Sequence, residues 1–322
     1  MSQTLADYEA IRSGCALLAR SSRGKVEVAG TEAALFLHNI CTNDIKKLPA
    51  MTGCEAFWCN ITAKVIAHGF VWRQPDDGKR QTFLLDLAPS LTEKLIAHLD
   101  KHLISEDAVL TDRTREKVQF HLVGPDADRV LASLGLLGDA MAPLTWREVE
   151  GVTVRRVDAL GVPGYDLLSA DGSELRDRLV AAGARSIGDE AAEIVRVETG
   201  TPTYGIDIDE NTFAPEVNRT AKAISYNKGC YLGQEPIVMA RDRGVVQRLL
   251  LGLTFAGPAP VGAMLHRDGK EVGRVTSSVV SPTRGTIGLG YVRRGSQTPG
   301  TVLEAKMGEN RVSATVTAVP PV

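Results

Sequence analysis

The chain has 322 residues, of which 43% are hydrophobic, 24% charged and 5% aromatic, and its 37 basic side chains nearly balance 39 acidic ones. A formal charge of −2 argues against a protein that holds nucleic acid or an anionic membrane by bulk electrostatics. No run approaches about 18 consecutive apolar residues, and the N-terminus lacks the apolar core of a signal peptide, so we expect a cytoplasmic protein without a membrane span.

The first third of the chain predicts short strands mixed with helices. Thr31 predicts the N-cap of a helix that runs through Ile40. Asp77-Gly78 is typical of a hairpin turn, and leucines at helical spacing predict a helix over residues 90–103. The predicted strands are 25–28, 57–58, 65–72 and 82–87. This order indicates an α+β fold rather than strict βαβ alternation.

The middle third repeats this mixture. Pro125 favours the start of a helix, and a segment resembling a capping box at residues 186–189 predicts a helix that ends at Gly200. The other predicted elements are strands at 118–123 and within 151–170, and a helix over 173–182.

The last quarter of the chain changes character near Arg248. Short β-prone runs are separated there by Gly, Pro and Asp-Gly turns, which predicts a small all-β barrel or sandwich. We therefore place a boundary near residue 245, between a region of two α+β lobes at 1–244 and a β-barrel domain at 245–322.

The strongest chemical signal lies at residues 227–235. Cys230 lies between two glycines, and Lys228 is close enough in sequence to favour a thiolate if the two side chains converge, so this pair is the candidate catalytic pair. Between Arg219 and Arg248, six basic residues stand against two acidic ones and form an anion-attracting patch. The alternative is a small cysteine buried in a loop beside solvated basic residues. The five cysteines form no CxxC pair, so reduced thiols are expected.

The run from Lys228 to Glu235, KGCYLGQE, resembles the signature of the YgfZ branch of the glycine-cleavage T-protein superfamily. Three further elements in the same order are similar to family motifs: Phe36-Leu-His with Thr42-Asn-Asp, residues 161–166, and residues 196–207. The resemblance implies an α+β fold, with a three-lobed ring around a central folate channel and a small C-terminal β-barrel.

The resemblance also implies a folate site. A carboxylate can accept two pterin donors in bidentate fashion, and Asp166 is the implied carboxylate. Arg196 and Glu198 are implied as a ligand contact and its orienting partner, with a structural ion pair beside a helix end as the alternative. The implied cofactor-binding residues together are Asp166, Arg196, Glu198, Tyr204 and Arg241.

One departure from the family pattern bears on activity. T-proteins carry an aspartate in an early strand where this chain has Ala67 and His68, which argues against aminomethyl transfer by the glycine-cleavage mechanism. His68 has the chemistry of a proton shuttle, and the alternative is a structural histidine in an apolar strand. His98 and His102 have a metal-sharing spacing without the glutamate of an HExxH motif, so no metal site is expected.

The leading hypothesis is a tetrahydrofolate-binding protein that supports assembly or repair of iron–sulfur clusters and, through them, tRNA methylthiolation, with Cys230 as a reactive thiol. The expected partners are folate and iron–sulfur proteins or tRNA-modifying enzymes, without direct nucleic-acid binding. The first alternative is an aminomethyltransferase or demethylase that moves a one-carbon unit to tetrahydrofolate. The second is a scaffold that binds tRNA through the basic patch.

Overall fold

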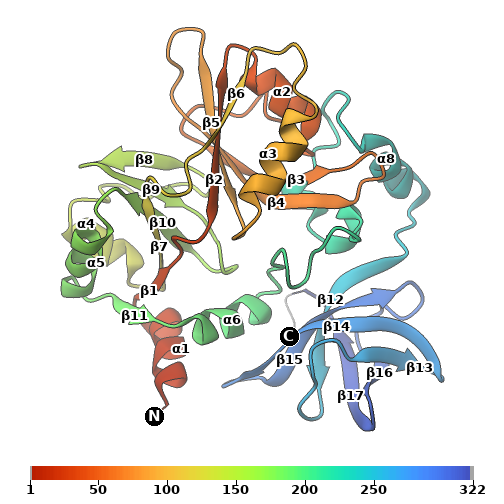
Figure 1. Cartoon of the computed structure of the whole chain (residues 1–322). Helices are drawn as coiled ribbons and strands as arrows, with labels where there is room; N and C mark the ends of the chain where they lie inside the picture. The colour runs from red at the N-terminus through yellow and green to blue at the C-terminus, as the bar shows by residue number, and fades with distance from the viewer. Residues whose placement is uncertain (1, 320–322) are drawn as a thin grey trace.

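The computed structural model describes residues 2–319. Two open sheets and a closed barrel form three lobes around the middle of the molecule (Figure 1). The α+β fold and the C-terminal barrel predicted from the sequence are confirmed.

The first lobe is a six-stranded sheet. Its strands, in spatial order, are β11 (Arg185–Ile187), β1 (Ala16–Ala19), β7 (Val118–Val123), β10 (Gly164–Ser169), β9 (Val152–Arg156) and β8 (Trp146–Val149). The helices α4 (Ala127–Ser133) and α5 (Gly172–Ala181) belong to the same lobe. Leucines and valines of these helices pack against those of the sheet in one buried core, which includes residues of β7 and β10.

The second lobe is a five-stranded sheet, and all of its strands lie between β1 and β7 in the sequence. Its strands, in spatial order, are β3 (Gly53–Cys59), β4 (Val65–Arg73), β5 (Gln81–Leu87), β2 (Gly24–Gly30) and β6 (Val109–Asp112). Its helices are α2 (Ala33–Ile40) and α3 (Thr92–Asp100). The predicted Thr31 cap is wrong: the N-cap position of α2 is Glu32, and the Thr31 hydroxyl donates to Asp107 at 2.6 Å instead of accepting from a helix N–H group.

A third set of elements connects the lobes. These are α1 (Gln3–Ser13), α6 (Asp189–Glu198), the 3₁₀ helix η1 (Ala214–Val217), α7 (Thr220–Ala223) and α8 (Gln234–Arg243). The predicted capping box at residues 186–189 is wrong, because Ser186 belongs to β11 and α6 begins after Gly188 without a side-chain cap. The helix ends as predicted, with Gly200 at a φ of 68° that favours glycine.

The third lobe is a closed barrel. Its strands, in spatial order, are β12 (Arg248–Phe255), β15 (Gly285–Arg293), β14 (Lys270–Ser281), β13 (Met264–Arg267), β16 (Val302–Met307) and β17 (Asn310–Thr317). β12 pairs with both β15 and β17, so the sheet closes on itself and leaves no unpaired edge. The sandwich alternative is therefore excluded.

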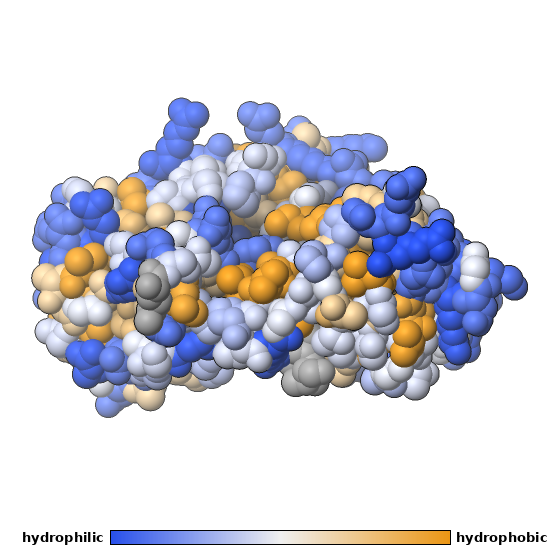
Figure 2. Space-filling view, turned by 90° about the horizontal axis from the view of Figure 1, so that it is seen from below, coloured by the Kyte–Doolittle hydropathy of each residue, from blue (hydrophilic) through white to orange (hydrophobic). Residues whose placement is uncertain are grey.

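The barrel contacts the rest of the molecule through α6 and η1. Val197 of α6 packs against Leu250, Ile287, Leu289 and Tyr291 of the barrel. Seen from below, the surface is a mosaic of hydrophilic residues and small hydrophobic patches (Figure 2). Among residues 2–319, no helix combines the length and hydropathy needed to cross a membrane.

Candidate functional site

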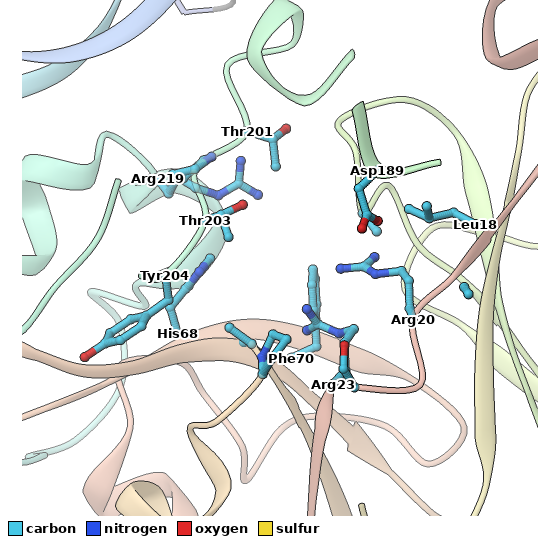
Figure 3. A pocket seen from close by; sticks show the side chains of 17 residues that line it. Leu18, Arg20, Arg23, His68, Phe70, Asp189, Thr201, Thr203, Tyr204 and Arg219 are labelled. Carbon is cyan, nitrogen blue, oxygen red and sulfur yellow. The ribbon is translucent and has the colours of Figure 1, made fainter. Parts of the chain in front are cut away.

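A cavity of about 210 Å³ lies between the two sheets and the segment that follows α6 (Figure 3). Its wall comes from the loop after β1, the middle of β4, the residues after β5, the start of α6 and the chain on either side of η1. Its charged and aromatic lining residues are Arg20, Arg23, His68, Phe70, Asp189, Tyr204 and Arg219. Three arginines against one aspartate make this cavity attractive to an anionic ligand.

One side of the cavity holds a histidine and a carboxylate in contact. Nε2 of His68, on β4, lies 2.7 Å from Oε1 of Glu55, on the neighbouring strand β3. Arg219 pairs with both Glu55 oxygens. Burial on its own would raise the pKa of the Glu55 carboxyl, but the hydrogen bond from His68 and the charge of Arg219 lower it to about 2. An ionised carboxylate only accepts, so His68 carries a proton on Nε2.

The opposite side of the cavity holds Arg20 and Arg23. Arg23 pairs with Asp86 of β5, whereas Nη1 of Arg20 is buried without a hydrogen-bond partner in the part of the chain that the structure describes. Burial lowers the pKa of Arg20 to about 10, which leaves it charged at neutral pH. Figure 3 shows the Arg20 guanidinium and the Asp189 carboxylate pointing toward one another. Nη1 of Arg20 lies 3.9 Å from Oδ1 of Asp166, an ion-pair distance without a hydrogen bond, so the Arg20 guanidinium keeps a donor for a ligand.

Asp166 lies behind this wall, on β10, and does not line the cavity. Its Oδ2 accepts from Gln119 at 2.9 Å, and its Oδ1 is 2.8 Å from Nδ1 of His121. Burial would raise the pKa of the Asp166 carboxyl, but the bond to His121 and the charge of Arg20, 3.9 Å away, hold it well below its usual range. The structure thus gives Asp166 internal partners, and contact with a pterin stays a prediction.

Arg196 and Glu198 lie outside the cavity lining and have separate sets of partners. The five N–H donors of Arg196 go to Glu193, Thr201, Asp207 and Ser277. Glu198 accepts from Tyr8, Arg12 and Ser281. The expectation that Glu198 orients Arg196 on the channel wall is therefore corrected: two residues apart on a helix, they face different neighbours and join α6 to α1 and the barrel.

Lys228 and Cys230 do not converge. The Lys228 ammonium donates to the carbonyl oxygens of His38, Cys41 and Asn43, and it lies 4.6 Å from the centre of the Tyr231 ring. Burial lowers the pKa of Lys228. Because all three of its donors are committed to carbonyls, Lys228 ties its loop to the end of α2 instead of activating the thiol. Cys230 is exposed, which rules out the buried-cysteine alternative.

Tyr204 and Arg241 differ in position. Tyr204 lines the cavity, and its hydroxyl accepts from Lys94 at 2.9 Å. Arg241, on α8, pairs with Asp242 at 2.7 Å and lies over the ring of Tyr226, outside the cavity lining.

The lining also includes residues that the sequence reasoning missed. Arg20 and Arg23 carry no motif that distinguishes them, and Asp189 was noted only as the end of the segment that resembles a capping box. Glu55, which contacts His68, could have been found from the sequence. It is the lone charged residue in the apolar run Gly53–Cys59, and a buried charge needs a partner.

Two family models together match most of the chain. The GCVT N-terminal domain matches residues 1–225, and the glycine cleavage T-protein C-terminal barrel domain matches residues 248–322. The chain belongs to the glycine cleavage T-protein family. The superfamily inferred from the four motifs is thereby confirmed, while the narrower resemblance to the YgfZ branch stays a prediction.

Individual T-protein relatives extend over nearly the whole chain. An aminomethyltransferase of Rubrobacter xylanophilus is 30% identical over 89% of this chain and 78% of its own length. A chloroplastic protein of Arabidopsis thaliana, named only as a transferase, is 28% identical over 97% of this chain and 72% of its own. The crystal structure of the glycine cleavage system aminomethyltransferase T from Bartonella henselae superposes with a TM-score of 0.90 at 22% identity, covering 99% of this chain and 89% of that one. This superposition shows that the two proteins share the fold.

Proposed function

We propose that this T-protein family member binds tetrahydrofolate, or a derivative of it, in the cavity between the two sheets. We further propose that, in the cytoplasm, it supports assembly or repair of iron–sulfur clusters and hence tRNA methylthiolation. The observation that carries the folate proposal is the cationic, partly aromatic lining of the cavity in a chain of this family.

The lining fits the chemistry of a folate. A folate has a flat pterin whose edge carries hydrogen-bond donors and acceptors, and it has an anionic glutamate tail. Phe70 and Tyr204 offer flat faces, and Asp189 offers an acceptor. Nη1 of Arg20, which makes no hydrogen bond among residues 2–319, offers a donor. Arg219 supplies positive charge for the tail, and its bond to Glu55 holds it in place.

Filling the cavity should abolish folate binding. Ala19 lines the cavity at an exposed position at the end of β1, so Ala19→Trp blocks the space with little cost to folding. We expect calorimetric titration with tetrahydrofolate to show one site in the wild type and at least about a tenfold weaker affinity in the variant, since a filled pocket loses its polar contacts.

The matched control is Ala181→Trp, which adds the same side chain at the exposed end of α5 and should bind as the wild type does. No heat of binding in the wild type would refute folate binding. Equal affinity in Ala19→Trp and the wild type would show that the folate binds elsewhere.

The iron–sulfur part of the proposal depends on Cys230. Its exposure makes the thiol accessible to a partner protein. In a strain that requires this gene, Cys230→Ser should lower the activity of cluster-containing enzymes under oxidative stress, whereas Cys15→Ser, a change at a buried thiol, should not. Full activity in the Cys230→Ser strain would contradict a role for this thiol.

A second candidate function is favoured by the contact between His68 and Glu55 on the cavity wall. A histidine held by a carboxylate is an arrangement that moves protons, as one-carbon transfer to tetrahydrofolate requires. Formation of 5,10-methylene- or 5-methyl-tetrahydrofolate in proportion to an added aminomethylated or methylated substrate would favour this function over the first. The tRNA scaffold has less support, because Arg219, Lys228 and Arg248 of the basic patch are engaged with partners inside the chain.

A further inference from the structure

A second cavity, of about 160 Å³, lies where the two sheets meet and shares no lining residue with the first. Its wall includes Lys25 of β2, Thr82 of β5, and Thr153 and Arg155 of β9. Lys117, just before β7, also lines it. Residues on or beside β2 and β5 of one sheet and on β8, β9 and β10 of the other thus enclose a space that none of the family motifs touches.

Two buried cations face this cavity with unused donors. Lys25 and Arg155 are each 1% exposed. The Lys25 ammonium has one acceptor among residues 2–319, the carbonyl oxygen of Arg23 at 3.0 Å, although an ammonium carries three N–H groups. Nε of Arg155 is buried without a partner among the same residues, while its Nη1 donates to Asp86 at 3.3 Å and its guanidinium lies over the Trp72 ring.

The surrounding charges do not balance. Around this cavity and the wall behind it, Arg20, Arg23, Lys25 and Arg155 face two buried carboxylates, Asp86 and Asp166. Burial lowers the pKa of His121, the remaining titratable group of this cluster, which favours the neutral imidazole, so His121 neither adds to the positive charge nor offsets it. Burial likewise lowers the pKa of Lys25 and of Arg155. Buried cations in excess of carboxylates are costly unless an anion compensates them.

The acidic residues of the cavity rim do not supply this compensation. Glu27 and Glu116 both pair with Arg113, which also lines the cavity. Glu148, also in the lining, is exposed, and its charge is therefore screened by solvent.

We propose that this second cavity binds a small oxyanion, such as inorganic phosphate, through the Lys25 ammonium and the Nε–H of Arg155. The Lys117 ammonium donates to the Thr153 hydroxyl at 3.0 Å. These two side chains add a second ammonium and a hydroxyl on the outer side of the cavity. An oxyanion accepts several hydrogen bonds at once, which matches donors that converge from two sheets. The proposal does not depend on folate binding, because the two cavities share no lining residue, although Asp86 pairs with Arg23 of the first and with Arg155 of the second.

The test is calorimetric titration of the full chain with inorganic phosphate at constant ionic strength in chloride. We expect one phosphate per chain in the wild type, and at least about a tenfold weaker affinity in Lys25→Met, because a lost charged hydrogen bond is worth at least that factor. Lys117→Glu is the second variant; it reverses a charge at a half-buried position, leaves the buried groups in place, and should also weaken binding.

Two matched controls make the same changes of charge outside the cavity. Lys79→Met and Arg115→Glu alter exposed residues that do not line it, and both should bind phosphate as the wild type does. Absence of phosphate binding in the wild type would overturn the proposal. So would equal weakening by Lys117→Glu and Arg115→Glu, since that result would indicate attraction by overall charge.

Discussion

Replacing Arg196 by methionine is expected to lower the free energy of unfolding by about 3 to 5 kcal/mol, the cost of removing one partner from a buried ion pair. Arg196 is 4% exposed and donates to Asp207 at 2.6 Å and to Ser277 of β14 at 2.8 Å. Methionine fills similar space but leaves the fully buried Asp207 carboxylate without its cation. Urea denaturation of the two proteins measures the difference.

The control for this change is Arg178→Met on α5. Arg178 pairs at 3.4 Å with Glu150, whose side chain is 65% exposed, so the loss should be below about 1 kcal/mol, as for surface ion pairs. Equal stability of Arg196→Met and the wild type would show that Arg196 does not hold α6 to the barrel, and its role as a ligand contact would gain support.

Replacing Glu55 by glutamine is expected to flatten the dependence of stability on acid pH. The Glu55 carboxyl has a pKa of about 2 in the folded chain, below its ordinary value of 4.5, so its ionised form stabilises the fold above pH 4.5 and this contribution is lost as the pH falls toward 2. The full contribution is about 3 kcal/mol, from 1.36 kcal/mol per unit of pKa.

Unfolding free energies measured from pH 7 to pH 3 check this expectation. Over this range the wild type should lose about 2 kcal/mol more than Glu55→Gln. Glu309→Gln, at an exposed turn between β16 and β17, is the control and should follow the wild type. Parallel curves for Glu55→Gln and the wild type would contradict a strongly paired Glu55.

Local patterns were sufficient to predict the elements that depend on neighbours in sequence. Alternating apolar residues predicted β4 and β7. Glycine-separated β-prone runs predicted the barrel, because β13–β14, β14–β15 and β16–β17 are hairpins between consecutive strands. β1 has four residues and no alternation that would distinguish it, so its place in a different sheet from β2 could not be predicted.

The candidate site shows the same limit. The resemblance directed attention to Asp166, but not to the partners of its carboxylate. Gln119 and His121 contact the two Asp166 oxygens only because β7 pairs with β10, which the sequence alone does not reveal. The side chains of Lys228 and Cys230 were expected to lie close together because the two residues are only two positions apart in sequence. The Lys228 ammonium is directed elsewhere, because a buried ammonium needs acceptors and the end of α2 presents three carbonyl oxygens.

The position of β1 has a consequence for how the molecule assembles during synthesis. β1 emerges from the ribosome early, yet its partners β7 and β11 are made only after the entire five-stranded lobe. Pairings between such distant segments form late, because a long loop must close first. All strands of the five-stranded lobe lie in one continuous stretch of sequence, so this lobe is able to fold before β1 has paired with β7 and β11. The order in which this chain is made therefore differs from the order in which its lobes become complete.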